Sequence, residues 1–158
     1  MTADALSPVP QPGQPAPDFT LASTSGESVT LSALRGRPVL LAFFPLAFTS
    51  TCTAELCDIR DDYDAFTSSG VVVLPISVDS VATLREFKQK LQLEVDLVSD
   101  FKREASRRYG TLIDDRFYSN RAYFLVDAGG TVRWAHVEAN PGQRRKNSEI
   151  FSEIEKLK

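Results

Sequence analysis

The chain has 158 residues, a formal net charge of −3, 42% hydrophobic residues and two cysteines. A chain of this length fits one domain, which buries enough apolar surface to fold without a disulfide framework or a structural metal. The weak negative charge offers no basic face for nucleic acid, and the short basic run at residues 144–146 is expected to be solvated surface.

Prolines dominate the beginning of the chain, where five of the nine fall between residues 8 and 17. Because proline fixes φ and lacks an N–H, residues 1–16 are predicted to be extended or flexible, within a single domain that spans residues 1–158. This start lacks the basic and apolar regions of a signal peptide, and the longest apolar run, residues 39–48, is too short to cross a bilayer. We therefore expect a soluble, cytoplasmic protein with no membrane partner, in which a cysteine pair is more often catalytic or metal-binding than structural.

The first strong pattern is a strand followed by a helix. Residues 39–44 form a wholly apolar run that predicts a short buried strand, which Pro45 ends. Thr49, Ser50 and Thr51 can each cap a helix. Apolar residues then recur three and four apart as far as Phe66, which predicts an amphipathic helix over about residues 51–66.

The rest of the chain alternates strands and helices. The predicted elements are a buried strand at 71–79, a helix at 81–91 capped by Ser80, a short strand at 97–98, a charged helix at 102–109, a hairpin of strands at 122–127 and 131–137, and a final helix at 147–157. This order predicts an α/β fold, with a mixed central sheet and helices on both faces. Sites in such sheets lie at the carboxyl ends of strands, which is where both cysteines fall.

Cys52 lies in the first turn of the predicted helix, where free N–H groups and the helix dipole favour an anion. A thiol there is favoured as the reactive thiolate, and its polar neighbours argue against an inert buried cysteine. Cys57 follows five residues later, so in a wound helix the two Cα atoms would be roughly 8.6 Å apart. A disulfide needs less than roughly 7 Å. The spacing therefore suits a transient disulfide that requires local unwinding, with simple packing of Cys57 as the alternative.

Other chemistries find little support. A zinc site needs four ligands, and His136 is the only histidine, expected to be an ordinary residue of the strand at 131–137. The presence of only one histidine also disfavours a Cys–His hydrolase. The absence of a C-x-x-C motif disfavours thioredoxin-type exchange. No glycine-rich nucleotide motif is present, so neither a cofactor nor a metal is expected.

The stretch PLAFTSTC fits the pattern P-x-x-x-T-x-x-C with Pro45, Thr49 and Cys52 in register, and it resembles the peroxiredoxins. Flanking stretches from GQPAPDFTL at residue 13 to NRAYFLVDAGGTVRW carry the likeness over nearly the whole chain. CTAELC is similar to the bacterioferritin comigratory protein, or Q-type, subfamily. PLAFTSTC also resembles the E-type alkyl hydroperoxide reductases, which typically lack the second cysteine. The resemblance implies the peroxiredoxin variant of the thioredoxin-like fold.

The resemblance also implies a function. Cys52 would be the peroxidatic residue of a thiol-dependent peroxidase that reduces hydrogen peroxide or organic hydroperoxides. Cys57 would resolve the sulfenic acid as an intramolecular disulfide, and a thioredoxin-like dithiol reductant would recycle it. A one-cysteine peroxidase resolved by an external thiol and a non-enzymatic redox sensor stay open as alternatives. The protein would be a monomer or a homodimer.

Four further residues receive roles from the resemblance. Thr49 would hydrogen-bond the thiolate and the peroxide, and it can also serve as the helix N-cap. Pro45, which has no N–H, would shield the thiolate from solvent. Arg121 would stabilise the thiolate and the leaving oxygen. Glu55 would orient that arginine, with a favourable charge in the first helical turn as its alternative role.

Overall fold

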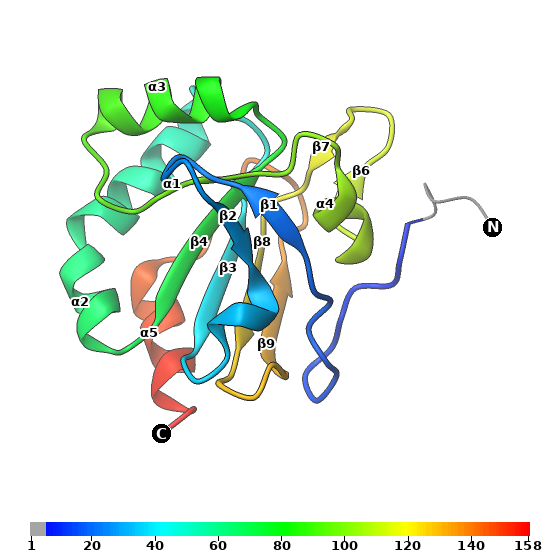
Figure 1. Cartoon of the computed structure of the whole chain (residues 1–158), viewed down its shortest axis with the longest axis vertical. Coiled ribbons are helices and arrows are strands. Elements are labelled where there is room, and N and C mark those ends of the chain that lie inside the picture. The colour runs from blue at the N-terminus through cyan, green and yellow to red at the C-terminus, as the bar shows by residue number, and fades with distance from the viewer. Residues whose placement is uncertain (1–5) are drawn as a thin grey trace.

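The computed structural model describes residues 6–158 and centres on one five-stranded sheet (Figure 1). The strand order is β5-β4-β3-β8-β9, with bounds of Val39–Phe43 for β3, Val72–Ser77 for β4, Val98–Ser99 for β5, Ala122–Val126 for β8 and Val132–Val137 for β9. β3, β4 and β5 run parallel, whereas β8 is antiparallel to β3 and β9 is antiparallel to β8. The predicted mixed sheet is confirmed.

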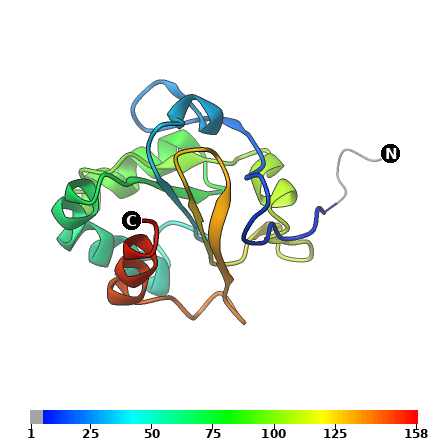
Figure 2. The ribbon, with the colours of Figure 1, turned by 90° about the horizontal axis from the view of Figure 1, so that it is seen from below.

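Helices cover both faces of this sheet, as predicted. Their bounds are Ser50–Asp61 for α1, Tyr63–Ser68 for α2, Val81–Leu91 for α3, Glu104–Arg108 for α4 and Asn147–Glu155 for α5. One core joins the sheet to α1, α2, α3 and α5. The second core joins it to α4 and to a hairpin of β1 (Thr20–Ala22) and β2 (Ser28–Thr30). Figure 2 shows α5 and α4 on opposite sides of the sheet.

The central strand β3 explains why its sequence is apolar throughout. Leu40 and Ala42 point into the first core, whereas Leu41 and Phe43 point into the second. Because strand side chains alternate between faces, a strand covered on both sides needs apolar residues at every position. The neighbouring strand β4 tolerates Pro75 because β5 pairs with only its last two residues, which leaves the outer flank of Pro75 without a ladder partner.

The structure differs from the prediction in its short elements. The helix expected over residues 51–66 is two helices, because the backbone at Asp62 leaves the helical region at φ −106° and ψ 14°. Three elements were not predicted: the β1–β2 hairpin, the 3-10 helix η1 (Leu31–Leu34), and a hairpin of β6 (Leu112–Ile113) and β7 (Tyr118–Ser119). Strands of two or three residues are too short for alternation to mark them.

The N-terminal segment is hydrogen-bonded to the rest of the molecule. The Ser7 N–H donates to the Arg107 carbonyl at 2.9 Å, and the Gly13 N–H donates to the Val132 carbonyl at 2.8 Å. Gly110, at φ +68°, permits the close approach, because a Cβ there would lie 2.4 Å from the Ser7 carbonyl oxygen. Residues 1–5 lie outside the described part of the chain, and the division of the chain into one domain with a flexible start stays a prediction.

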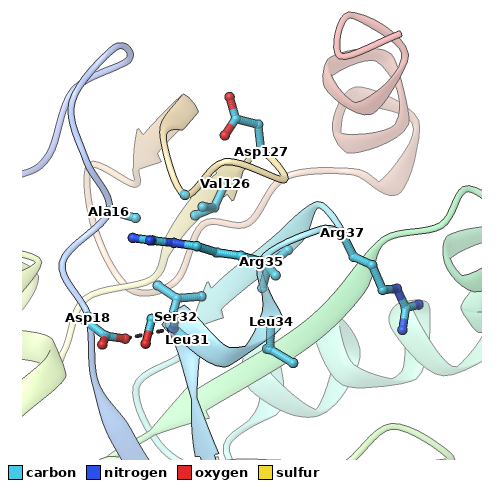
Figure 3. A pocket seen from close by; sticks show the side chains of 11 residues that line it. Ala16, Asp18, Leu31, Ser32, Leu34, Arg35, Arg37, Val126 and Asp127 are labelled. Carbon is cyan, nitrogen blue, oxygen red and sulfur yellow. Dashed lines mark hydrogen bonds between the residues drawn. The ribbon is translucent and has the colours of Figure 1, made fainter.

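A small hollow of about 20 Å³ lies at the amino end of β3 (Figure 3). The Arg35 side chain crosses it and approaches Gly130, where a Cβ would lie 2.9 Å from the Arg35 Nε. This volume holds about one water molecule, so the hollow is too small for a larger ligand. The cysteines lie beyond the other end of β3. Of the helices in residues 6–158, none is long and apolar enough to cross a membrane.

Candidate active site

The loop between β3 and α1 is held by the neighbouring parallel strand. The Ala47 N–H donates to the Asp79 Oδ2 at 2.8 Å, and the Ser77 hydroxyl donates to the same oxygen at 2.7 Å. Phe48 has a positive φ of 67°, which is uncommon for a bulky residue. Its ring packs on Phe87 of α3 with the centroids 5.0 Å apart. These contacts fix the point at which α1 begins.

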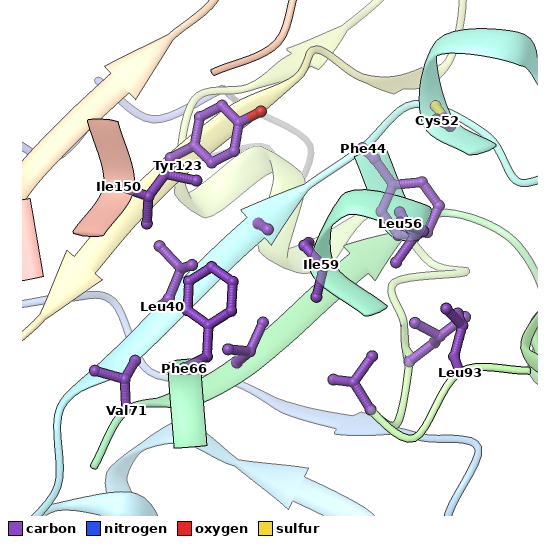
Figure 4. Close-up of a cluster of buried hydrophobic side chains, with 14 of the residues drawn as sticks. Leu40, Phe44, Cys52, Leu56, Ile59, Phe66, Val71, Leu93, Tyr123 and Ile150 are labelled. Atoms are coloured by element: carbon purple, nitrogen blue, oxygen red, sulfur yellow. The ribbon is translucent and has the colours of Figure 1, made fainter. Parts of the chain in front are cut away.

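Cys52 lies in the first turn of α1 and is 1% exposed. It belongs to the same buried cluster as Phe44 and Leu56 (Figure 4), so its surroundings are more apolar than the flanking threonines suggested. One polar partner reaches it, because the Arg121 Nη2 donates to the Cys52 Sγ at 3.0 Å. A guanidinium at hydrogen-bonding distance stabilises a thiolate.

Arg121 precedes β8 and is also 1% exposed. Its Nη1 donates to the Glu55 Oε1 at 2.6 Å, and its Nε and Nη2 both donate to the Pro141 carbonyl, at 3.2 and 3.1 Å. Burial opposes the positive charge, but the negative charges of Glu55 and Cys52 raise the pKa of Arg121 above its ordinary value. The guanidinium is therefore charged and fixed by acceptors on three sides.

Glu55 lies one helical turn after Cys52 and is 3% exposed. Its second oxygen, Oε2, accepts a hydrogen bond from the Tyr123 hydroxyl at 2.5 Å. Burial raises the pKa of Glu55, while Arg121 and Tyr123 act against this shift. Both carboxylate oxygens accept hydrogen bonds, which is the arrangement that an ionised carboxylate needs.

A hollow of about 190 Å³ opens beside Cys52 and contains four of the six predicted site residues. Its lining consists of Pro45, Leu46, Thr49, Ser50, Thr51, Cys52, Tyr118, Arg121, Pro141 and Gly142. Glu55 lies behind Arg121, outside this lining. The structure thus brings the predicted proline, threonine, cysteine and arginine to one place.

Thr49 differs in part from the expectation. It occupies the N-cap position of α1, but its side chain makes no capping hydrogen bond. Instead, the Thr49 hydroxyl donates to the Leu46 carbonyl at 2.8 Å. Its one hydrogen is therefore engaged within the loop, and what this hydroxyl can still offer a substrate is an acceptor oxygen.

Cys57 lies apart from the hollow, half-buried on α1. Both thiols are free, and α1 is wound from Ser50 to Asp61, which includes both cysteines. The separation expected for a wound helix therefore holds, and no disulfide can form without a change in α1.

The basic run at residues 144–146 was expected to be solvated surface, and Arg144 and Arg145 are partly exposed but also form ion pairs within the molecule. Arg144 forms an ion pair with Asp58 of α1. The Arg145 Nε donates to the Glu138 Oε2 at 2.9 Å, and the Glu138 side chain is 1% exposed. His136 lies on β9 as predicted. The Arg144 pair joins the loop after β9 to α1, and no local pattern predicts a contact between residues so distant in sequence.

Sequence reasoning missed three residues around the site, namely Tyr118, Pro141 and Tyr123. Tyr118 belongs to the two-residue strand β7 and Pro141 to the loop after β9, and neither segment has a pattern of its own. Tyr123 left a signal, because it lies in β8 two positions after Arg121, and positions two apart in an extended chain share one face. Within residues 6–158, no group of three or more His, Cys, Asp and Glu side chains is placed to hold a metal ion.

Comparisons with known proteins find relatives by sequence and by structure. The model of the AhpC/TSA family matches residues 12–135. The chain is 38% identical over 136 residues to a putative peroxiredoxin bcp from Coxiella burnetii, which covers 81% of this chain and 90% of the relative. It is 38% identical over 136 residues to alkyl hydroperoxide reductase E from Mycobacterium bovis, covering 84% and 88%. The crystal structure of reduced 2-Cys peroxiredoxin from Plasmodium vivax has a TM-score of 0.85 at 31% identity, covering 92% and 80%.

Proposed function

This chain belongs to the AhpC/TSA family and is a thiol-dependent peroxidase of the peroxiredoxin type, and on that premise we propose that Cys52 is its peroxidatic residue and Cys57 its resolving residue. One observation carries the proposal: the Arg121 guanidinium contacts the Cys52 sulfur at 3.0 Å, and both residues line the same hollow. A buried thiolate with a fixed cation and an adjacent cavity is what attack on a peroxide needs.

In the first step the Cys52 thiolate attacks one peroxide oxygen and the O–O bond breaks. The sulfur becomes a sulfenic acid, and the other oxygen leaves as hydroxide or alkoxide and takes up a proton to become water or an alcohol. Arg121 supplies positive charge where the leaving oxygen becomes negative. The Thr49 oxygen accepts the peroxide O–H and so sets the direction of attack. Pro45 lines the hollow without an N–H that could bind the thiolate.

In the second step Cys57 attacks the sulfenic sulfur, an S–S bond forms and water leaves. Because the cysteines lie five residues apart on a wound helix, the first turns of α1 must unwind before this step. A thioredoxin-like dithiol protein then reduces the disulfide and returns both thiols.

The hollow is larger than hydrogen peroxide requires. Its lining includes apolar groups from Leu46, Tyr118 and Pro141, which favours organic hydroperoxides as substrates alongside hydrogen peroxide. The monomeric or homodimeric state and the cytoplasmic location stay predictions.

The first test is the intact mass of the reduced protein after it reacts with one equivalent of peroxide under non-reducing conditions. We expect the wild type to lose about 2 Da, as an internal disulfide requires. Cys57→Ser should instead gain about 16 or 32 Da, because Cys52 is oxidised but not resolved. Cys52→Ser should keep its mass.

Two outcomes would change the proposal. A gain of about 16 Da in the wild type would make this a one-cysteine peroxidase that an external thiol resolves. Oxidation of Cys52→Ser at the wild-type rate would remove Cys52 from the first step. Consumption of many peroxide equivalents with thioredoxin as electron donor separates an enzyme from a redox sensor, which is oxidised once.

A further inference from the structure

We propose that Tyr123 is a positioning residue of this peroxidase: its hydroxyl fixes the Glu55 carboxylate, which in turn holds Arg121 against the sulfur of Cys52. The inference rests on the proposed role of Cys52. It extends the site by one residue that does not line the hollow and that acts entirely through its neighbours.

The direction of the Tyr123 hydrogen bond follows from its two partners. The Arg145 backbone N–H donates to the Tyr123 oxygen at 3.0 Å. An N–H cannot accept, so the hydroxyl hydrogen is directed to the other partner, the Glu55 Oε2. Burial and the charge of Glu55 both raise the pKa of Tyr123, so the phenol keeps the hydrogen that it donates.

Glu55 needs this donor because its carboxylate is buried away from solvent. The carboxylate is 3% exposed, and Arg121 donates to one oxygen while Tyr123 donates to the other. Without the hydroxyl, Oε2 is a buried acceptor with no partner, which is costly. The carboxylate then gains by rotating or by taking up a proton. Either change alters the ion pair that orients Arg121.

Arg145 and Trp134 in turn fix the position of Tyr123. The Arg145 side chain donates to Glu138 at 2.9 Å and to Glu149 at 3.2 Å, which fixes the backbone N–H that meets the phenol. The Tyr123 ring stacks on Trp134 at a centroid distance of 6.0 Å. Figure 4 shows the hydroxyl directed toward the side of the core where Cys52 lies.

The hydrogen bonds close into a ring. The Glu138 N–H donates to the Arg121 carbonyl at 3.0 Å, so the residue that anchors Arg145 also anchors the backbone of the arginine. The path from Arg121 through Glu55, Tyr123, Arg145 and Glu138 therefore returns to Arg121. This ring supports the Arg121 backbone and the Glu55 carboxylate that holds the guanidinium with Nη2 on the sulfur.

The test is Tyr123→Phe, which removes one oxygen and keeps the ring. We expect the second-order rate constant for oxidation of Cys52 by hydrogen peroxide, measured by quenched mass spectrometry, to fall about tenfold, equivalent to about 1.4 kcal/mol. The matched control is Tyr109→Phe. Tyr109 is fully buried in the other core, and its hydroxyl donates to the Pro17 carbonyl at 2.6 Å. We expect this control to lose comparable thermal stability and to keep its rate within about twofold.

A double-variant cycle separates positioning from packing. If Tyr123 acts through Glu55, Tyr123→Phe combined with Glu55→Gln should be no slower than Glu55→Gln alone. If the rate losses of the two single variants multiply in the double variant, Tyr123 acts through packing and the proposal is overturned. A Tyr123→Phe rate equal to that of the Tyr109→Phe control would overturn it as well. If the wild type fails to oxidise at Cys52, the proposed function fails first. Rapid oxidation of Cys52 in both the wild type and Tyr123→Phe contradicts only the role of Tyr123.

Discussion

At the scale of single residues, the site is organised around one arginine shared by a thiol, a carboxyl group and a backbone carbonyl. Arg121 contacts the Cys52 sulfur, the Glu55 carboxylate and the Pro141 carbonyl at the same time. These acceptors lie in different directions, which suits a planar guanidinium with five donors rather than the single ammonium of a lysine. The residue type is therefore dictated by the geometry of three acceptors as much as by charge.

The Thr49 hydroxyl donates to the Leu46 carbonyl, so we predict that it serves the peroxide as an acceptor. Thr49→Val should lower the rate of Cys52 oxidation by peroxide at least about tenfold, because the substrate loses the oxygen that orients it. Alkylation of Cys52 by iodoacetamide, which needs no such orientation, should change less than about twofold. Thr49→Ser is the matched control and should keep both rates. An equal loss in both reactions of Thr49→Val would instead mean that Thr49 supports the thiolate itself.

The placement of site residues could be anticipated where a local pattern carried it. Pro45, Thr49 and Cys52 share one short stretch that runs from the end of a strand into the first turn of a helix, and sites gather where strands end. The placement of Arg121 in the site was predicted only from the resemblance, because an arginine before a strand has no distinguishing pattern. Tyr123 was missed because a buried tyrosine in a strand looks like an ordinary core residue until its partner is known. The roles of all these residues stay predictions.

At the scale of secondary structure, α1 has two incompatible duties in the proposed cycle. It must be wound to hold Cys52 beside Arg121, and unwound to bring Cys52 to Cys57. Its two ends are anchored differently. The Asn147 side chain donates to the Asp58 carbonyl at 2.9 Å and to the Asp62 carboxylate at 2.8 Å. The beginning of α1 lacks a side-chain cap, so its first turns are held mainly by the hydrogen bonds of Cys52 and Glu55 to Arg121 and Tyr123, and they can open while the end stays attached if these bonds break.

This asymmetry predicts that helix propensity between the cysteines sets the rate of disulfide formation. Glycine costs a helix about 1 kcal/mol relative to alanine, and threonine is also a poorer helix former than alanine. Ala54→Gly should therefore speed the conversion of sulfenic acid to disulfide by about fivefold, whereas Thr53→Ala should slow it by a few fold. The measurement is the time course of mass loss after one turnover with peroxide.

Ala65→Gly is the matched control for this pair of variants. Ala65 is exposed on α2, so the same substitution imposes a similar backbone cost outside the segment that must open. Its rate of disulfide formation should equal that of the wild type. If Ala54→Gly and Thr53→Ala change the rate in the same direction, unwinding of α1 does not limit this step.

Elements with a long, regular pattern were predicted and irregular ones were not. The prediction of α3 was correct because Leu84 and Phe87 are buried on one face and Ser80 caps the helix through the Thr83 N–H. The break between α1 and α2 was missed because the apolar face continues across it, with Ile59 and Phe66 both buried. Periodicity reports which face is buried, and it cannot show a local change in backbone direction.

At the scale of the whole molecule, Asp96 joins three parts of the chain that are distant in sequence. Its carboxylate accepts from Lys88 of α3 at 2.6 Å and from Thr24, in the β1–β2 turn, at 2.9 Å. The Thr24 N–H in turn donates to the Leu97 carbonyl at 2.9 Å, next to the start of β5. One carboxylate thus ties a helix, a hairpin and the edge of the sheet together, on the flank of the sheet where β5 is short.

We expect this junction to make the stability of the reduced protein depend on pH in acid. Burial raises the pKa of Asp96, but the hydrogen bonds from Lys88 and Thr24 and the charge of Lys88 outweigh it, so the pKa lies below the ordinary 3.8. A carboxyl whose pKa is lower in the folded state stabilises the fold above its unfolded pKa, and this contribution is lost as the pH falls through the folded pKa.

Asp96→Asn should therefore be less stable than the wild type at pH 7, and this difference in stability should disappear below about pH 3.8. Urea unfolding between pH 7 and 2 measures it. Lys88→Gln removes the other half of the ion pair, so its loss of stability relative to the wild type should also shrink over the same pH range. If the difference in stability between Asp96→Asn and the wild type stays constant with pH, Asp96 contributes through its neutral hydrogen bonds alone.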